Sequence, residues 1–279
     1  MSAGTAQQSR VAVVTGGGRG FGREIARRLA GRGYAVLVTD LDAASADETA
    51  GEIGGGAWSR VLDVRDPEAH REAAAEAAER GRLAVWVNNA GVLRTEKVWE
   101  HSDADVRLIV ETNVLGVMWG SRAAVETMRN SATGDEHVIN LASMSAFGPV
   151  PGLAVYASSK HAVLGFTTSL QGDLRSAGLP IRVHALCPDG ADTPMVRERA
   201  GDREAAIIWS GSRLLTPQEV AEGAMALLDS RRIVLALPRH RAVLVRALGL
   251  APGIGVRLGE PLRRLGERRR SASARARTG

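Results

Sequence analysis

Cysteine is almost absent from the chain, which has Cys187 as its single thiol among 279 residues. One cysteine cannot form an internal disulfide, and it cannot build a metal site that needs several thiolates. The six histidines are scattered, and no two of them stand at the spacing that places a pair of metal ligands on one helical face. The sequence therefore predicts no metal site.

Long apolar runs are also missing. No run approaches the roughly 20 apolar residues that span a bilayer. The first ten residues are polar and lack the apolar centre of a signal peptide. We therefore expect a cytoplasmic protein in which residues 1–10 form an N-terminal arm.

The net charge of +5 is distributed unevenly along the chain. Residues 239–279 contain eleven arginines and two glutamates. The positive charge of this segment exceeds the net charge of the whole chain, so residues 1–238 are mildly acidic. A basic-protein argument for nucleic-acid binding therefore fails for the main body of the chain, and we expect no nucleic-acid partner.

Short apolar runs alternate with stretches of helical periodicity. Strands are expected at residues 11–15, 35–39, 61–62, 84–87, 137–141 and 181–186, and helices at 21–31, after 39, and at 67–79, 104–130 and 156–177. The strands lack polar alternation, as strands do when helices cover both faces of a sheet. The pattern predicts one α/β domain over 11–238, a Rossmann-type doubly wound parallel sheet with helices on both faces. A basic, partly apolar C-terminal extension follows over 239–279.

A glycine-rich segment joins the first expected strand to the first expected helix. Glycine lets the backbone turn sharply and approach a pyrophosphate, whose charge the N-terminus of a helix favours. Glycine clusters also mark ordinary turns, but the strand before this one and the helix after it favour a cofactor site. The residues expected to contact the cofactor here are Gly16, Gly18, Arg19, Gly20, Phe21 and Gly22.

The choice between NAD and NADP depends on two side chains of opposite charge. Asp40 follows the second expected strand, where a carboxylate accepts hydrogen bonds from the ribose hydroxyls of NAD and repels a 2′-phosphate. Alternatively Asp40 caps the next helix, a role that Asp42 could equally fill. Arg19 favours NADP, because a guanidinium pairs with that phosphate. Direct repulsion outweighs an arginine that can turn to solvent, so we predict NAD, with NADP less favoured.

The glycine spacing resembles that of the short-chain dehydrogenase/reductase family, T-G-x-x-x-G-x-G. Further matches to the family follow in order between residues 11 and 235: Asp63, Asn88-Asn89-Ala90-Gly91, Asn113, Ser143 and Tyr156-Ala157-Ser158-Ser159-Lys160. The resemblance implies contacts with the adenine from Asp63 and Val64, with the adenosine ribose from Asn89, Ala90 and Gly91, and with the nicotinamide end from Tyr156, Lys160, Pro188 and Thr193. It also implies a homodimer or homotetramer built on the helices that contain Asn113 and Tyr156.

The chemistry of Tyr156 and Lys160 can be argued from the residues themselves. Removing a hydride from an alcohol requires a base for the hydroxyl proton. Free tyrosine, with a pKa of about 10, is a poor base at neutral pH. A lysine four residues later stands on the same helical face, and its charge favours the phenolate. We therefore predict Tyr156 as the base in oxidation and the acid in carbonyl reduction, with Lys160 lowering its pKa.

Ser143 and Asn113 complete the predicted catalytic group. Ser143 would donate a hydrogen bond to the substrate oxygen, and Asn113 resembles the family residue that holds a water in the proton relay. Each residue also has an ordinary structural alternative, such as a turn serine, a buried polar residue or a solvated Tyr–Lys pair. The joint occurrence of four such residues in the family's order makes the catalytic interpretation the better one.

One position departs from the family pattern. Where the family has Pro-Gly after the sixth strand, this chain has Pro188-Asp189-Gly190. Asp189 adds a side chain and a negative charge where glycine permits close approach to the nicotinamide, and Gly190 is left to absorb the turn.

The loops beyond the strand ends are expected to select the substrate. They cover residues 93–94, 145–155 and 195–215, and with Met144 they supply a mostly apolar set: Met144, Phe147, Val150, Leu153, Met195, Ile207, Ile208 and Trp209. An apolar secondary alcohol or ketone is therefore expected as the substrate.

The C-terminal extension has two interpretations. Its mixture of apolar residues and arginines suits weak contact with a membrane surface. Alternatively it is a helix packed on its own domain or on a sister subunit, with residues 268–279 disordered. We favour this second interpretation, because glycines and prolines between 249 and 261 interrupt a continuous helix.

The function predicted from the sequence is hydride transfer between NAD(H) and a secondary alcohol or ketone. The alternatives are an NADPH-dependent ketone reductase, a non-catalytic nucleotide-binding regulator and a peripheral membrane scaffold.

Overall fold

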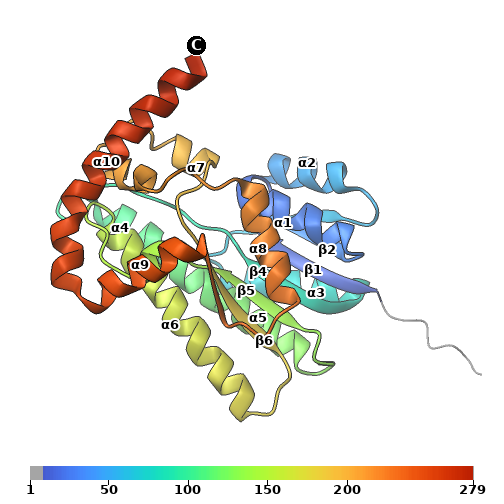
Figure 1. Cartoon of the computed structure of the whole chain (residues 1–279). Coiled ribbons are helices and arrows are strands. Elements are labelled where there is room, and N and C mark those ends of the chain that lie inside the picture. Colours follow the sequence, from blue (N-terminus) through green and yellow to red (C-terminus); the bar gives the residue numbers. More distant parts are fainter. Residues whose placement is uncertain (1–8, 279) are drawn as a thin grey trace, which may run out of the picture.

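Residues 9–278, which the computed structural model describes, fold around a parallel sheet of seven strands (Figure 1). The strands are β1 (Arg10–Thr15), β2 (Ala35–Asp40), β3 (Trp58–Val61), β4 (Arg82–Asn88), β5 (His137–Leu141), β6 (Arg182–Pro188) and β7 (Val234–Leu237). Their order is β3-β2-β1-β4-β5-β6-β7. The order reverses between β1 and β4, and open α/β sheets bind ligands at such a point.

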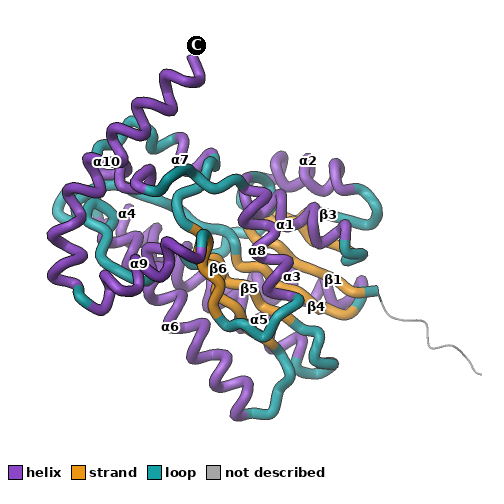
Figure 2. The backbone as a smooth tube through the Cα atoms, in the orientation of Figure 1, coloured by secondary structure: helices purple, strands orange, loops and turns teal. Residues whose placement is uncertain are grey.

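Helices cover both faces of the sheet (Figure 2). One face carries α1 (Gly20–Gly31), α2 (Ala43–Ile53) and α8 (Pro217–Leu228), and the other carries α3 (Pro67–Arg80), α5 (Gly116–Met128) and α6 (Ala154–Ser176). Ile25 and Leu29, one turn apart on α1, pack on Val14 and its neighbours in the first core. Trp86 lies in the second core with residues of α3 and α5. The predicted doubly wound fold is confirmed.

Several element boundaries differ from the sequence prediction. The third strand, β3, shares only Val61 with the expected segment, and β7 was not predicted. The single helix expected over 104–130 is α4 (Asp103–Val110), a π-helical turn η1 (Glu111–Leu115) and α5. Residues 1–8 of the expected N-terminal arm lie outside the described residues, and Arg10 already belongs to β1.

The C-terminal extension forms two helices, α9 (Arg239–Leu250) and α10 (Pro252–Thr278). The expected interruption is confined to Ala251, and Pro261 lies inside α10. The expected disorder is wrong for residues 268–278, which α10 includes, while Gly279 lies outside the described residues. Among residues 9–278, none of the helices is both long and apolar enough to cross a membrane.

Packing on the chain's own domain explains why α10 persists. It lies against the 3₁₀ segment η3 (Glu204–Ser210). Arg269 donates a hydrogen bond to the carbonyl of Ser210 (2.7 Å), and Arg270 donates to the carbonyl of Asp202 (2.7 Å). These tertiary contacts offset the poor helix propensity of glycine and proline.

A chain of buried hydrogen bonds ties β4 to β5 and α5. The indole N–H of Trp86 donates to Asn88 Oδ1 (2.7 Å), and the Asn88 amide donates to Ser121 Oγ (3.0 Å) and to Asn140 Oδ1 (2.8 Å). All four side chains are at most 2 % exposed. Removing the shared partner would leave several buried polar groups unsatisfied.

We expect Asn88→Ala to lower the free energy of unfolding by about 2–4 kcal/mol, because each orphaned buried group costs about 1–3 kcal/mol. Urea denaturation followed by tryptophan fluorescence measures the change. The exposed Asn130→Ala is the matched control. A loss no larger than that of the control would show that the network contributes nothing to stability.

Candidate active site

A pocket opens at the carboxyl ends of β4, β5 and β6. Its wall is formed by the start of α1, the segments that follow β4, β5 and β6, the first turns of α6, and residues of η3 and the C-terminal extension. The predicted site residues along its wall are Phe21, Asn89, Gly91, Ser143, Tyr156, Lys160, Pro188 and Thr193. The other predicted cofactor residues do not line this pocket; the glycine loop and Asp40 follow β1 and β2 at the same edge of the sheet.

The glycine loop needs its glycines for close contact. Gly16 has a φ of +61°, and a Cβ on Gly22 would overlap the carbonyl oxygen of Gly16. A Cβ on Gly18 would overlap Ser45 Oγ. The first turn of α1 has no side-chain cap and no acidic residue. Its N–H groups therefore suit an anion such as a pyrophosphate.

Asp40 is held rigidly by two backbone N–H groups. Its Oδ2 accepts from Gly18 N (3.0 Å), and its Oδ1 accepts from Asp42 N (3.2 Å). Asp42, and not Asp40, caps α2 by accepting from Ala44 N. The alternative role for Asp40 as a helix cap is therefore wrong, and its carboxylate stands at the end of β2 beside the glycine loop.

Arg19 and Asp63 each belong to an ion pair: Arg19 pairs with an acidic residue, and Asp63 pairs with a basic one. Arg19 lies 3.3 Å from Glu198, with both side chains more than half exposed. Arg65 donates hydrogen bonds to Asp63 and holds the pKa of that carboxyl below its usual range. Val64 is buried against Gly116 of α5.

Asn89 fastens the end of β4 to the end of β1. Its amide donates to the carbonyls of Thr15 (3.0 Å) and Gly16 (2.8 Å), and its backbone N–H donates to Thr15 Oγ1 (3.0 Å). Ala90 N donates to the same hydroxyl. These bonds hold the start of the loop after β4 against the end of β1 and the glycine loop.

Asn113 is fully buried in the π-helical turn and uses its whole side chain for structure. Its Oδ1 accepts from Val92 N (2.8 Å), and its Nδ2 donates to Val92 O (2.9 Å) and to Ser159 Oγ (3.2 Å). The side chain therefore joins the loop after β4 to α6, one residue before Lys160.

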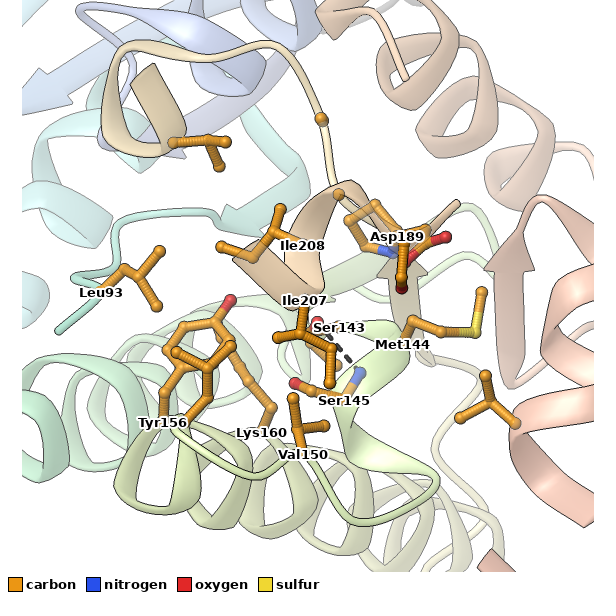
Figure 3. A pocket seen from close by; sticks show the side chains of 18 of the residues that line it. Leu93, Ser143, Met144, Ser145, Val150, Tyr156, Lys160, Asp189, Ile207 and Ile208 are labelled. Carbon is orange, nitrogen blue, oxygen red and sulfur yellow. Dashed lines mark hydrogen bonds between the residues drawn. The ribbon is translucent and has the colours of Figure 1, made fainter. Parts of the chain in front are cut away.

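Ser143, Tyr156 and Lys160 converge in the pocket (Figure 3). The Tyr156 hydroxyl is hydrogen-bonded with Ser143, and the Lys160 ammonium lies 5.7 Å from the centre of the tyrosine ring. Lys160 Nζ donates to the carbonyl of Leu141 (2.8 Å) at the end of β5. The pairing of Tyr156 with Lys160 on one helical face follows from their spacing of four residues.

Burial controls the ionisation of this group. It raises the pKa of Tyr156 to about 12, against the effect of the hydrogen bond with Ser143. It lowers the pKa of Lys160 to about 8, against the effect of the nearby Cys187. The direction for Tyr156 is opposite to the lowering predicted from the sequence, because removal from water, which disfavours the phenolate, is the largest influence on its pKa and outweighs the effect of Ser143.

The substrate side of the pocket is mostly apolar. Six of the eight apolar residues predicted for it line the wall: Met144, Val150, Leu153, Met195, Ile207 and Ile208. Phe147 instead lies under the guanidinium of Arg246, and Trp209 packs in a separate cluster with Val196. Leu93 also lines the pocket, whereas Arg94 pairs with Asp105.

Ser145 is a polar residue within this mostly apolar wall. It lines the pocket and is 9 % exposed, and its Oγ has no hydrogen-bond partner among the described residues. Its backbone N–H donates to Ser143 Oγ (3.1 Å), which places the two serines side by side (Figure 3).

Sequence reasoning missed the contribution of the C-terminal extension. Residues of α9 and α10 also line the pocket: Arg241, Val245, Leu248, Gly255, Gly259 and Leu262. Arg241 pairs with Asp189, the residue that departs from the family pattern. The sequence shows the departure of Asp189 from the family pattern and the arginines of the extension, but no local pattern that relates the two.

The chain is similar in sequence to known short-chain dehydrogenases. Residues 10–204 match the sequence model of a family described as short chain dehydrogenase. The 1-deoxy-11-beta-hydroxypentalenate dehydrogenase of Streptomyces exfoliatus is 35% identical over 82% of this chain and 82% of its own. The galactitol 2-dehydrogenase (L-tagatose-forming) of Cereibacter sphaeroides is 35% identical over 77% of this chain and 86% of its own.

Solved structures agree with the sequence relatives. A short chain dehydrogenase/reductase from Burkholderia phymatum, solved with NAD, has a TM-score of 0.79 at 28% identity and covers 88% of this chain and 95% of its own. An actinorhodin polyketide ketoreductase variant solved with NADPH has a TM-score of 0.73 at 32% identity and covers 82% of this chain and 95% of its own.

Lys160→Met tests the cost of the buried ammonium. The pKa of Lys160 is about 8 in the folded chain against an ordinary 10.5, so the unfolded chain binds the proton more tightly. The resulting penalty of about 3 kcal/mol is fully present below pH 8 and disappears as the pH rises to 10.5. We expect the variant to be more stable than wild type by about 1–3 kcal/mol at pH 7, after the loss of the Leu141 hydrogen bond.

Urea denaturation at pH 7 and pH 10 measures this difference, which should shrink at the higher pH. The exposed Lys97→Met is the matched control. Equal differences at both pH values would mean that burial does not lower the pKa of Lys160.

Proposed function

The chain belongs to the short-chain dehydrogenase family, and on that basis we propose that it transfers a hydride between NAD(H) and an apolar secondary alcohol or ketone. The observation that carries the proposal is the convergence of Ser143, Tyr156 and Lys160 in one pocket beside the glycine loop. This arrangement joins a proton donor, a hydrogen-bond donor and a cation at the place where a nicotinamide would lie.

The residues at this edge of the sheet fit a nicotinamide dinucleotide. The uncapped N–H groups of α1 would hold the pyrophosphate, Asp40 the adenosine ribose, Lys160 the nicotinamide ribose and Thr193 the carboxamide. Val64 and Asp63 would flank the adenine, and Asn89 to Gly91 would lie beside the adenosine ribose. When bound, the nicotinamide supplies the carbon that accepts or releases the hydride.

NAD is the better fit of the two cofactors. The Asp40 carboxylate is fixed by Gly18 N and Asp42 N, so it cannot easily turn away from a 2′-phosphate. The competing Arg19 side chain is 63% exposed and pairs with Glu198, and an exposed pair of this kind is worth less than about 1 kcal/mol. The fixed negative charge therefore outweighs the mobile positive one.

Tyr156 exchanges the proton with the substrate oxygen. In alcohol oxidation it receives the hydroxyl proton, while the Ser143 hydroxyl donates to the same oxygen and the Lys160 ammonium stabilises the phenolate. In carbonyl reduction the Tyr156 hydroxyl donates its proton. With a pKa of about 12, that hydroxyl is protonated at neutral pH and ready to act as the acid.

Asn113 contributes to the proton relay by holding neighbouring elements in place. Both polar groups of its side chain are engaged with Val92 and Ser159, so it fixes the π-helical turn and the start of α6. π-Helical turns are frequent at functional sites. We assign Asn113 the task of shaping the space behind Lys160 in which a relay water would sit.

The apolar wall supports an apolar substrate. The names of the relatives refer to two different alcohols, a hydroxypentalenate and galactitol, so the names do not choose between them. The lining favours the apolar alcohol, since Leu93, Leu153 and Ile207 offer no partners to the several hydroxyl groups of an open-chain polyol. Ser145 can serve one further polar group of the substrate.

Tyr156→Phe should remove at least about 99 % of turnover, because general acid–base catalysis contributes about 10²–10⁴-fold. The assay is the absorbance change of NADH with a panel of apolar secondary alcohols and ketones. NADH fluorescence should show that the variant still binds the cofactor. Full activity in the variant would exclude Tyr156 as the proton donor, and binding without turnover in wild type would favour a nucleotide-binding regulator.

Asp40→Ser should shift the preference from NAD⁺ toward NADP⁺ by about tenfold or more, since removing a like charge from a phosphate site is worth about 1 kcal/mol or more at short range. The measurement is kcat/KM for both cofactors with the same alcohol. Asp47→Ser, on the exposed side of α2, is the control. A wild-type enzyme that already prefers NADP⁺ would make Arg19 the deciding residue and the protein an NADPH-dependent reductase.

A further inference from the structure

Asp189 has a specific partner in the C-terminal extension. Its Oδ2 lies 2.6 Å from Nε of Arg241 on α9, and the two side chains are only 15% and 20% exposed. Burial raises the pKa of Asp189, and the arginine acts against this rise. A buried carboxylate of this kind is stable only while its cation stays in place.

Arg241 joins three separate segments of the chain. Besides Asp189 in the loop after β6, it donates a hydrogen bond through Nη2 to Ser210 Oγ (2.6 Å) in η3. The Asp189 N–H in turn donates to the carbonyl of Leu237 (2.8 Å), directly before α9. One arginine therefore holds together the loop that follows Pro188, the apolar segment η3 and the start of the extension.

Glycines seat the rest of the extension directly on the substrate loops. A Cβ on Gly249 would overlap the carbonyl oxygen of Phe147, and a Cβ on Gly259 would lie 2.6 Å from Pro151. A Cβ on Gly266 would overlap the carbonyl oxygen of Ala206 in η3. By contrast, a Cβ on Gly253 would meet nothing within 4 Å.

The inner side of this extension faces the reaction pocket. Arg241, Val245, Leu248 and Leu262 line the same pocket as Tyr156. The unpartnered hydroxyl of Ser145 also belongs to that pocket, and a buried hydroxyl without a partner points to a ligand that would satisfy it.

We propose that Asp189 and Arg241 are positioning residues that make the C-terminal extension a fixed wall of the substrate pocket. Where the family has a flexible glycine after β6, this chain has an ion pair that ties the loop after β6 to α9. The position of that loop, beside the cofactor site, is therefore fixed relative to the wall formed by the extension. The wall confines the pocket to a compact apolar substrate with one polar group within reach of Ser145. The substrate part of this inference rests on the proposed function; the tether does not.

A double-mutant cycle over Asp189→Gly and Arg241→Gln tests the tether. Arg241→Gln should raise KM for a compact apolar alcohol by about tenfold with kcat changed less than about threefold, and the double variant should recover most of that loss, since residues in contact couple by this order. Arg241→Lys, which keeps the charge, should retain part of the wild-type KM. Effects that simply multiply in the double variant would overturn the proposal.

Two further readouts separate the tether from the enzymatic assignment. Trypsin, which cleaves after arginine, should cut the extension of Arg241→Gln at least about tenfold faster than that of wild type, and the unfolding midpoints of the four proteins should be non-additive. Arg264→Gln, exposed on α10, and Gly253→Ala should behave as wild type in every assay. Gly266→Ala should mimic the loss of the tether in KM and in cleavage.

A wild-type chain without turnover on any alcohol or ketone would remove the proposed function, while accelerated cleavage and non-additive midpoints would still support the tether. An extension that trypsin cleaves equally fast in wild type and in Arg241→Gln would overturn the tether, even in an active enzyme.

Discussion

The hydrogen bonds between Asn89 and the end of β1 are the contact on which the site depends. They join the ends of β1 and β4, the neighbouring strands between which the strand order reverses. On one side lie the glycine loop and Asp40, and on the other lie Ser143, Tyr156 and Lys160. Because a parallel sheet brings the carboxyl ends of all its strands to one edge, these bonds, together with the pairing of β1 and β4, hold the cofactor half beside the proton-transfer half.

The chemistry at this edge is held at an electrostatic cost. Burial favours the neutral forms of both Tyr156 and Lys160, so the folded chain keeps a tyrosine and a lysine where two apolar side chains would be more stable. The Leu141 carbonyl and the Ser143 hydroxyl offset part of this cost. An arrangement that lowers stability and places both groups in a pocket is typical of functional sites.

The parts of the fold that could be predicted from the sequence are those governed by local patterns. Apolar strands, the glycine loop and the Tyr156–Lys160 spacing each depend on residues close together in the chain. The strand β7 was missed because its four residues are too few to show a pattern. The continuity of α10 was missed because three of its glycines, Gly255, Gly259 and Gly266, are close contacts with other segments and not helix breaks, which only the tertiary structure reveals.

The same distinction applies inside the site. The identities of Ser143, Tyr156 and Lys160 followed from their order, and the structure brings them together in one pocket. The direction of the pKa of Tyr156 did not follow, since it depends on how much water the surrounding elements remove. The partner of Asp189 was equally out of reach, because nothing local relates the loop after β6 to Arg241 on α9.

The way the extension is seated has a consequence for how this protein can change. The residues that handle the proton are scattered from Ser143 to Lys160, whereas those that wall the pocket from outside form one continuous stretch after β7. Substrate range could therefore diverge by replacement of a single terminal segment, with the catalytic residues untouched. The replacement would not be independent, however: a side chain at Gly259 would require the ring of Pro151 to give way, and a side chain at Gly249 would require the backbone at Phe147 to move. Related chains that share this seat should accordingly keep glycine at 249 and vary at 259 and 151 together.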